Sequence, residues 1–320
     1  MSSSVSLIRA TSYESEALRE SLETLLEPLG GITAFVKPGN RVLLKPNLLT
    51  GARPTKECTT RPELVYAVAQ MVIAAGGKPF LGDSPAFGSA MGVAIANGYK
   101  PIIDELQLPI IDFHGQRYQT INAEFTHLLL SKEAMEADVI INLPKVKSHV
   151  QLVVTLGTKN LFGCVPGKMK AWWHMEAGKD VNRFGNMLVE TARSIDPDLT
   201  IIDGIIAHQG NGPSNGEPRH LGVLGASTDV FALDRAMVEI LNVPPEEVPT
   251  VAASMRLGLL GNLTDIHFPH LRPDLLQIDD WQLPDKYMPI DFGMPRVIKS
   301  TFKHIYIRFI KERIKAYGKG

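Results

Sequence analysis

The sequence contains very little cysteine. Of its 320 residues only two are cysteines, Cys58 and Cys164, and they lie far apart in the chain. A zinc or iron–sulfur site with four cysteines is therefore excluded within one chain, and structural disulfides are not expected. We predict no intrachain four-cysteine iron–sulfur cluster, and the identity of any other cofactor or metal stays open.

Long apolar runs and a strong net charge are also absent. No run approaches the roughly 20 apolar residues of a spanning helix. The N-terminus lacks the basic region and apolar core of a signal peptide. The formal net charge of −1 gives no general case for a nucleic-acid partner. We therefore expect a cytoplasmic protein that does not bind nucleic acid.

Apolar runs that alternate with helical patterns predict the fold class. The expected strands include residues 5–10, 41–44, 78–82, 139–143 and 199–202. Amphipathic helical stretches separate several of them, which is typical of an α/β protein with a largely parallel sheet and helices on both faces. We assign residues 1–290 to this α/β domain, built either as one body or as two lobes.

Residues 291–320 form a basic, amphipathic C-terminal segment. Helical spacing places six apolar side chains on one broad face, although Ile307 lies on the basic side: Phe302, Ile305, Tyr306, Phe309, Ile310 and Ile314. Such a helix fits a membrane surface, a protein partner or its own domain. Peripheral membrane contact through residues 294–320 is thus one alternative, and oligomerisation is left open.

The most informative stretch runs from Asp138 to Gly167. A buried strand at 139–143 ends at Pro144, and basic and amide side chains follow it: Lys145, Lys147, His149, Lys159 and Asn160. Open α/β sheets bind ligands at the carboxyl ends of their strands. Because the clustered cations repel one another, an anionic ligand explains them better than core packing does. A solvated basic loop is the competing interpretation.

Other predicted strand ends carry similar residues. Lys45 and Asn47 follow the strand at 41–44, and Asp83 and Ser84 follow the strand at 78–82. Thr60 and Glu63 have the spacing of a capping box, at a helix start that could also hold an anion with the help of Arg61. Thr60 and Arg61 are therefore ligand-binding candidates, with simple capping as the alternative.

The strand at 199–202 leads to a carboxylate and a glycine-rich loop. Asp203 follows it directly, and Gly210 and Asn211 begin the loop. Asp234 lies among apolar residues of a later helix, where a carboxylate is costly to bury unless it is paired. Gly163 and Gly167 would let a ligand approach the backbone closely.

These residues suggest a division of roles. Five cations would hold a small anionic substrate or a phosphate- or carboxylate-bearing cofactor: Lys45, Arg61, Lys145, Lys147 and Lys159. His149 is the most plausible proton-transfer group, because the ordinary pKa of histidine lies nearest neutrality. Asp83, Asp203 or Asp234 would orient it or a divalent metal. We name His149, Lys159 and Asp203 as candidate catalytic residues.

The motifs resemble the prokaryotic family known as domain of unknown function 362. The resemblance covers roughly residues 40–245 in order, through the motifs KPN at 45–47, TTRPE at 59–63, GDSP at 82–85, NLPKVKSH at 142–149, GTKNLFGCVPG at 157–167, DG at 203–204, GNGP at 210–213 and ALD at 232–234. Many relatives carry a ferredoxin-like iron–sulfur module whose cysteines this chain lacks. Relatives often have a glutamate before the GNGP-type loop, where this chain has Gln209.

A weaker similarity is to the nickel-pincer lactate racemase family. It rests on the Thr-Arg-Pro sequence at residues 60–62 and on His149, Gly157, Lys159, Pro166 and Gly167. The similarity implies a proton-transferring or metal-contacting role for His149 and a cofactor attachment or contact role for Lys159. The second histidine of that pattern is missing, with Asp83 and Ser84 in its region.

Three functions fit the sequence. The first is an enzyme of unknown reaction class that binds a small anionic ligand. The second is a redox protein that works with an iron–sulfur or other electron carrier on another chain. The third is a binding or scaffold protein recruited to membranes through its C-terminal segment.

Overall fold

The computed structural model of the chain describes residues 3–118, 123–125, 128–291 and 306–307. Nine strands form one sheet: β1 (Val5–Arg9), β2 (Arg41–Pro46), β3 (Lys78–Asp83), β4 (Ile110–Asp112), β7 (Val139–Leu143), β8 (Lys145–His149), β9 (Val153–Thr155), β10 (Leu199–Gln209) and β11 (Glu217–Ser227). The main order is β1-β11-β10-β7-β2-β3-β4, and β8 pairs with β10 and β9. A separate hairpin consists of β5 (Gly115–Tyr118) and β6 (Leu128–Ser131).

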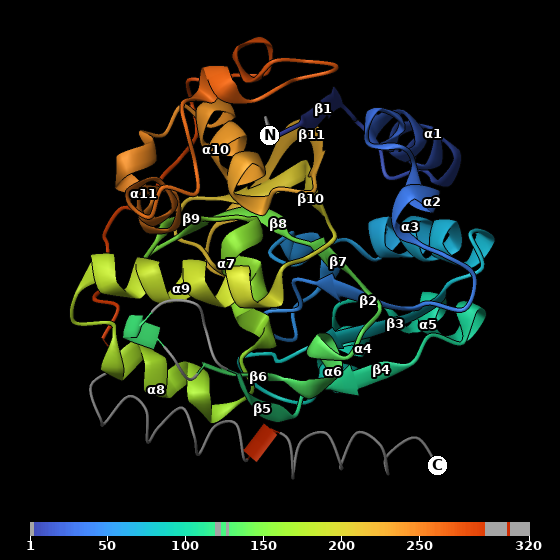
Figure 1. Cartoon of the computed structure of the whole chain (residues 1–320), viewed down its shortest axis with the longest axis horizontal. Helices are drawn as coiled ribbons and strands as arrows, with labels where there is room; N and C mark the ends of the chain where they lie inside the picture. Colours follow the sequence, from blue (N-terminus) through green and yellow to red (C-terminus); the bar gives the residue numbers. More distant parts are fainter. Residues whose placement is uncertain (1–2, 119–122, 126–127, 292–305, 308–320) are drawn as a thin grey trace.

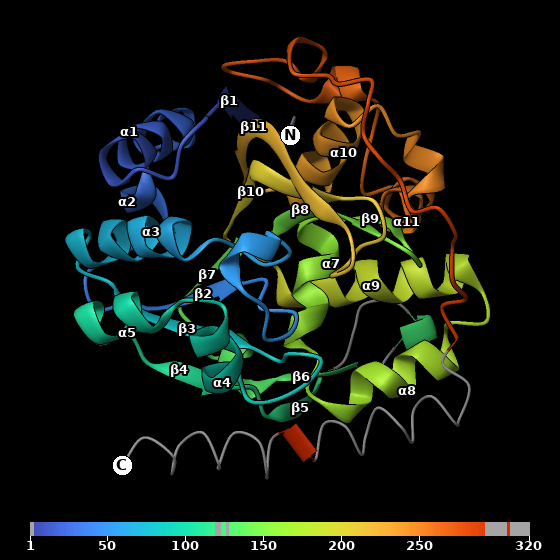
Figure 2. The same ribbon diagram turned by 180° about the vertical axis from the view of Figure 1, so that it is seen from behind.

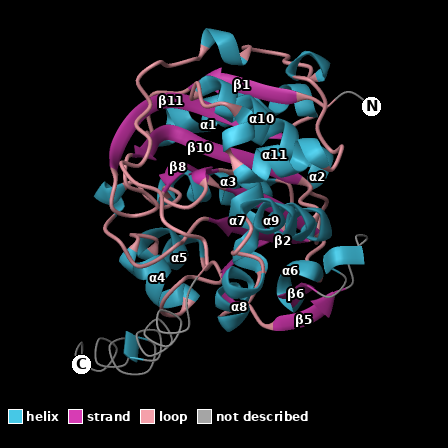
Figure 3. Cartoon of the chain, turned by 90° about the vertical axis from the view of Figure 1, so that its left-hand side faces the viewer, coloured by secondary structure: helices cyan, strands magenta, loops and turns pink. Residues whose placement is uncertain are grey.

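The central strands of the sheet are parallel. β10, β7, β2, β3 and β4 all run in one direction, and β8 runs parallel to β10. β1, β11 and β9 are antiparallel to their partners. Figure 3 shows β1 and β11 at one end of the molecule and the β5–β6 hairpin at the other. The predicted, largely parallel sheet is confirmed.

Eleven α-helices lie within the described residues. They are α1 (Ser15–Leu26), α2 (Ile32–Phe35), α3 (Pro62–Ala74), α4 (Ala90–Ala96), α5 (Lys100–Leu106), α6 (Lys132–Met135), α7 (Gly157–Leu161), α8 (Lys168–Glu176), α9 (Val181–Ile195), α10 (Val230–Ile240) and α11 (Pro249–Arg256). α1 and α3 pack on one face of the sheet, and α7, α9 and α10 pack on the other (Figures 1 and 2). The prediction of helices on both faces is thus confirmed.

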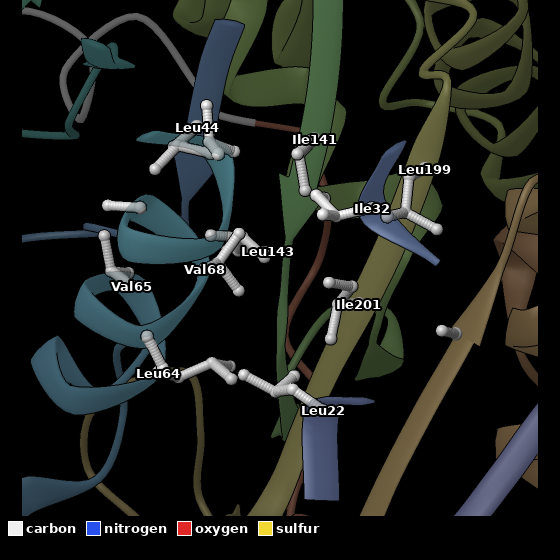
Figure 4. Packing of buried hydrophobic residues seen from close by; sticks show 14 of the residues in the cluster. Leu22, Ile32, Leu44, Leu64, Val65, Val68, Ile141, Leu143, Leu199 and Ile201 are labelled. Atoms are coloured by element: carbon white, nitrogen blue, oxygen red, sulfur yellow. The ribbon is translucent and has the colours of Figure 1, made fainter. Parts of the chain in front are cut away.

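Side-chain alternation along the strands explains the two layers. In β2, Val42 and Leu44 point to the core under α1 and α3, whereas Leu43 points to the core on the opposite face. β7 behaves in the same way, and both strands are apolar on both faces because both faces are covered. Figure 4 shows Leu22 of α1 beside Ile201 of β10 in the first core.

Two predicted boundaries are wrong. The strand that begins at Leu199 continues to Gln209, with a register shift between Gly204 and Ile206 where it pairs with β11. Asp203 therefore lies inside the strand and not at its end. The segment from Lys145 to His149, which we expected after the end of a strand, is itself the strand β8.

The C-terminal segment lies largely outside the described residues. Of residues 294–320 only Tyr306 and Ile307 are described, so its amphipathic character and its contacts stay predictions. Within the described part of the chain, no helix has both the length and the apolar character needed to cross a membrane.

The core contact in Figure 4 gives a stability prediction. Leu22 has 0% exposure, so Leu22→Ala leaves a cavity between α1 and the sheet. We expect the free energy of unfolding, measured by urea denaturation, to fall by about 2–5 kcal/mol. Ile73→Ala, at a position that is 43% exposed, is the control and should change it by no more than about 0.5 kcal/mol. Equal losses in both variants would contradict this packing.

Candidate functional site

The geometry of strand β8, residues 145–149, places its three basic residues on one side of the sheet. β8 pairs in parallel with β10 and antiparallel with β9. Because side chains alternate along a strand, Lys145, Lys147 and His149 share one face of β8, and Val146 and Ser148 take the other. Val146 packs into the apolar core. Three basic side chains therefore project to the same side of the sheet.

Lys145 lies between two buried carboxylates. Its Nζ is 3.1 Å from Glu57 Oε2 and 3.1 Å from Asp203 Oδ2. Asp203 stands beside Lys145 in the register of β8 and β10. Tyr13 donates its hydroxyl to Asp203 Oδ1 at 2.5 Å. Burial, followed by the charge of Asp203, raises the pKa of Tyr13, so its phenol stays protonated.

Arg61 completes this group, which we call the Lys145 network: Tyr13, Glu57, Arg61, Lys145 and Asp203. The Arg61 guanidinium is 3.3 Å from Glu57 Oε1 and lies over the Tyr13 ring, 4.8 Å from its centroid. Its backbone N–H donates to Asp203 Oδ2 at 3.1 Å. Two cations thus face two carboxylates, and the network balances its own charge.

Thr60 connects two strand ends and does not cap a helix. α3 begins after Arg61, which occupies the N-cap position without a side-chain cap bond. The Thr60 hydroxyl instead donates to Leu143 O at 2.6 Å and accepts from Asn47 N at 2.9 Å. The predicted capping box with Glu63 is wrong because the Thr60 side chain serves the end of β7.

Lys45 and Asp83 form a second neutral unit. Lys45 Nζ is 3.0 Å from Asp83 Oδ1, and both side chains are buried. Asp83 also accepts from Leu48 N at 3.1 Å. Gly163 packs directly on this pair: a Cβ there would lie 2.1 Å from Asp83 Oδ1 and 2.6 Å from Lys45 Nζ. Only a glycine fits without moving the ion pair.

Amide side chains link this ion pair to β8. Asn160 donates to Lys45 O at 3.1 Å and to Asn142 Oδ1 at 2.8 Å. Its Oδ1 accepts from Asn47 Nδ2 at 3.0 Å, and Asn47 Oδ1 in turn accepts from Lys147 Nζ at 2.8 Å. The Asn160 amide is therefore used by the protein itself, and it holds Lys45 and Asn47 in place.

Three further lysines have no carboxylate partner. Lys147, Lys159 and Lys170, here called the lysine cluster, form no ion pair with any residue that the structure describes. Lys147 donates to Asn47 Oδ1 and, at 3.0 Å, to Cys58 O. Because an ammonium has three N–H groups, Lys147 has one left for a ligand. The cluster is therefore a local excess of positive charge.

Lys159 and Lys170 come from neighbouring helices. Lys159 lies in α7, and its Nζ stands over the Phe162 ring, 4.3 Å from the centroid. It has no hydrogen bond among the described residues, and part of its side chain stays accessible to solvent. Lys170 lies in α8 and donates to the carbonyl oxygen of Ser84.

Burial without a carboxylate partner lowers the pKa values of these lysines. Burial, followed by the charges of Lys170 and Lys147, lowers the pKa of Lys159 to about 7. Burial is also the main reason why the pKa of Lys147 and that of Lys170 each fall to about 8. All three amines therefore exchange protons near neutral pH, and an anion among them would restore their charge.

His149 is neutral at neutral pH. Its Nδ1 accepts from Gln151 N at 3.0 Å, so its proton is on Nε2. Burial, followed by the charges of Lys159 and Lys147, lowers its pKa well below the ordinary 6.5. His174 of α8 is another neighbour in this electrostatic group. The amine with a pKa nearest 7 here is Lys159, while His149 can donate a hydrogen bond from Nε2.

Asp234 orients the helix that carries Lys159. Its two carboxylate oxygens accept from Gly157 N at 2.7 Å and from Thr158 N at 2.9 Å, at the first turn of α7. Burial raises its pKa to about 7, and these two amides oppose the shift. The predicted ligand residue thus binds backbone amides and fixes α7 in the fold.

Ser84 and Gly167 position α8. Ser84 Oγ accepts from Gly167 N at 2.9 Å, and Gly167 occupies the N-cap position of the helix. The Ser84 backbone N–H donates to Gly163 O at 3.1 Å. Both residues therefore lie beside the lysine cluster, through Lys170.

The GNGP loop contacts the other face of β8. Ser148 Oγ donates to Gly210 O at 2.6 Å, and Asn211 pairs with Asp285 at 2.8 Å. Gln209, where relatives often have a glutamate, donates to Glu217 Oε1 at 3.0 Å. The Gly210 N–H also donates to Gln282 O at 2.8 Å. Gly210 and Asn211 are therefore held by residues 282–285 and do not lie on the face of β8 that carries Lys147.

Sequence reasoning missed four contributors: Tyr13, Glu57, Phe162 and Lys170. Tyr13 and Glu57 lie in no motif that could have marked them. Lys170 has a detectable signal, because it precedes His174 by four residues and the two side chains share a helix face.

The donor set of the site favours an anion over a bare metal cation. Within residues 3–118, 123–125, 128–291 and 306–307, no three His, Cys, Asp or Glu side chains converge into a group that could hold a metal ion. The carboxylates at the site already face Lys45, Lys145 and Arg61. The unpaired groups are amines, which repel a cation at neutral pH.

A family model for a domain of unknown function (DUF362) matches residues 42–239, more than half of the chain. The chain belongs to the DUF362 family. The predicted family is thereby confirmed. The matched region of this DUF362 protein contains the Lys45–Asp83 pair, the whole lysine cluster and every member of the Lys145 network except Tyr13.

Two similar proteins add context. A thylakoid-associated protein of Synechocystis sp. is 64% identical over 317 residues, which are 99% of each chain. Lactate racemase apoprotein from Thermoanaerobacterium thermosaccharolyticum has a similar structure, with a TM-score of 0.50 and 13% identity. That match covers 74% of this DUF362 chain but only 57% of the racemase. The predicted kinship with lactate racemases is confirmed for the fold alone.

The contact of Gly163 with the Lys45–Asp83 pair gives a second stability prediction. Gly163→Ala should push the pair apart and lower the free energy of unfolding by about 3–5 kcal/mol, as breaking a buried ion pair does. Gly51→Ala is the control, because its Cβ would meet only the Ala96 methyl, at 3.1 Å. If chemical denaturation shows the two variants equally stable, Gly163 does not support the ion pair as described.

Proposed function

We propose that this protein is an enzyme that binds a small anionic substrate, or a cofactor bearing phosphate or carboxylate, at the lysine cluster. The supporting observation is the division of charge among five buried or partly buried lysines. Lys45 and Lys145 have carboxylate partners, whereas Lys147, Lys159 and Lys170 have none among the described residues. An anion supplies the missing charge and lowers the cost of bringing three ammonium groups together.

Each group near the cluster has a distinct part in this proposal. Lys147 and Lys170 hold the anion, and His149 donates a hydrogen bond from Nε2. Lys159 is the acid–base or nucleophilic amine, since a buried lysine beside other cations has the lowered pKa that such chemistry requires. Asp203 acts indirectly, because its carboxylate fixes Lys145 and therefore the position of β8.

We further propose that the protein associates with the surface of a membrane. The name of the relative from Synechocystis, a thylakoid-associated protein, supports this inference. Residues 294–320 are the segment that we expect to mediate it, through an apolar helical face and basic side chains. Liposome flotation of the full chain and of a chain ending at residue 293 tests the proposal. Equal flotation of the two proteins would contradict the role of the segment.

Anion binding should depend on pH. Protonation of Lys159 below about 7, and of Lys147 and Lys170 below about 8, creates the charges that hold the ligand. We therefore expect the affinity for inorganic phosphate and for carboxylate metabolites to rise as the pH falls from 9 to about 6.5. Thermal-shift titration at several pH values measures this effect.

Two variants separate the cluster from general surface charge. Lys147→Met should weaken anion binding about tenfold or more, because the loss of one hydrogen bond to a charged group changes the affinity by about that factor. Lys179→Met removes an exposed lysine and should leave the affinity unchanged. If no anion shifts the melting temperature at any pH, or if both variants bind alike, the proposed function is wrong.

Lys159 should also make the stability of the free protein depend on pH. Folding lowers its pKa from 10.5 to about 7, so between these values the unfolded chain binds more protons than the folded one. Stability then falls as the pH drops from about 10 toward 7 and levels off below. Lys159→Met should flatten this part of the profile in urea denaturation at pH 7 to 9.5. A variant that is much less stable at every pH would instead indicate a structural lysine.

A further inference from the structure

We propose that the ligand of the lysine cluster is a small carbonyl compound with a carboxylate or phosphate group, and that Lys159 forms an imine with its carbonyl carbon. This inference rests on the proposed function, because it assumes that the cluster holds an anion. It adds the substrate class and the covalent step.

The position of the Lys159 amine supports a nucleophilic role. Its Nζ faces the Phe162 ring at 4.3 Å from the centroid and has no hydrogen-bond or carboxylate partner among the described residues. No strong interaction must therefore be broken before the amine attacks a carbon. α7 is held at its first turn by Asp234, which fixes the base of the side chain.

The neighbouring lysines, Lys147 and Lys170, bind the anionic group while Lys159 reacts with the carbonyl carbon. Lys147 is anchored by Asn47 Oδ1 and Cys58 O and keeps one N–H for an anion. Lys170 is anchored by Ser84 O. Burial, followed by the charges of these two lysines, lowers the pKa of Lys159 to about 7, so a large fraction of this amine is neutral at physiological pH. A desolvated lysine beside other cations is the arrangement that favours Schiff-base chemistry.

The step balances without an oxidant or a reductant. The neutral amine nitrogen of Lys159 attacks the carbonyl carbon, a C–N bond forms and the carbonyl π electrons move to oxygen. Proton transfer gives a carbinolamine. The C–O bond then breaks and the oxygen leaves as water, so both amine protons end in that water. An ammonium group of the cluster can donate a proton to the leaving hydroxyl, and the resulting amine can then accept the proton of the iminium nitrogen.

Reductive trapping tests this inference on the full-length protein. Three aldehydes differ in charge: glyoxylate has a carboxylate, glycolaldehyde phosphate has a phosphate, and glycolaldehyde has neither. Each is incubated with the protein and sodium cyanoborohydride, which reduces an iminium to a stable amine. Intact-mass spectrometry and peptide mapping then locate the adduct. We expect a single adduct on Lys159. It should form at least about tenfold faster with a charged aldehyde than with glycolaldehyde, because one hydrogen bond to a charged group changes the affinity by about that factor.

The two charged aldehydes distinguish the anionic groups. Faster trapping of glyoxylate assigns a carboxylate to the site, and faster trapping of glycolaldehyde phosphate assigns a phosphate. The rate should pass through a maximum between about pH 7 and 8, where Lys159 is largely neutral and Lys147 is still largely charged. Inorganic phosphate should slow the trapping of the wild-type protein, and this competition needs no variant.

Matched variants complete the design. Lys159→Arg should lose the adduct, while Lys179→Arg, at an exposed position, should keep it. Adducts spread over surface lysines, an equal rate with uncharged glycolaldehyde, or an unchanged adduct in Lys159→Arg would overturn the inference. If anions raise the melting temperature but no aldehyde is trapped, the imine is wrong and the proposed function stands. If neither effect occurs, both are wrong.

Discussion

The pairing of β8 with β10 and β9 is the constraint on which the site depends. It fixes the alternation that sends Val146 into the core and Lys145, Lys147 and His149 to the opposite side. A shift of one residue in this register would turn the basic side chains toward the apolar core and Val146 toward the charged groups. Asp203 stands beside Lys145 in this register, so the same pairing that creates the charge also neutralises part of it.

The lysine cluster keeps an excess of positive charge because the carboxylates nearby pair with other lysines. Lys45 has Asp83, and Lys145 has Glu57 and Asp203, at distances of 3.0 to 3.1 Å. These units are electrically neutral and their side chains are buried. Placing an unpaired ammonium group beside them is costly in the absence of a ligand. Buried ionisable groups with strongly shifted pKa values are more common at functional sites than elsewhere in a fold.

The sequence allowed the fold class, the lysines of the central motif and the family to be predicted, because apolar periodicity and short motifs are local signals. The Lys145 network could not be predicted, since Tyr13, Glu57 and Lys145 are brought together only by the sheet and the loop after β2. The extension of β10 beyond Asp203 was missed for a related reason. The polar residues Asp203, His208 and Gln209 interrupt the apolar pattern of that part of the strand, which pairs with β11 and β8.

The same physical effect gives His149 and Lys159 different protonation behaviour. Burial among cations disfavours the charged form of both groups. For the histidine, whose ordinary pKa is 6.5, the shift moves titration well below neutrality and leaves a neutral hydrogen-bond donor. For the lysine, whose ordinary pKa is 10.5, it brings titration to about 7. Among buried cations of this kind, the residue whose ordinary pKa lies furthest from neutrality becomes the one that titrates near neutral pH.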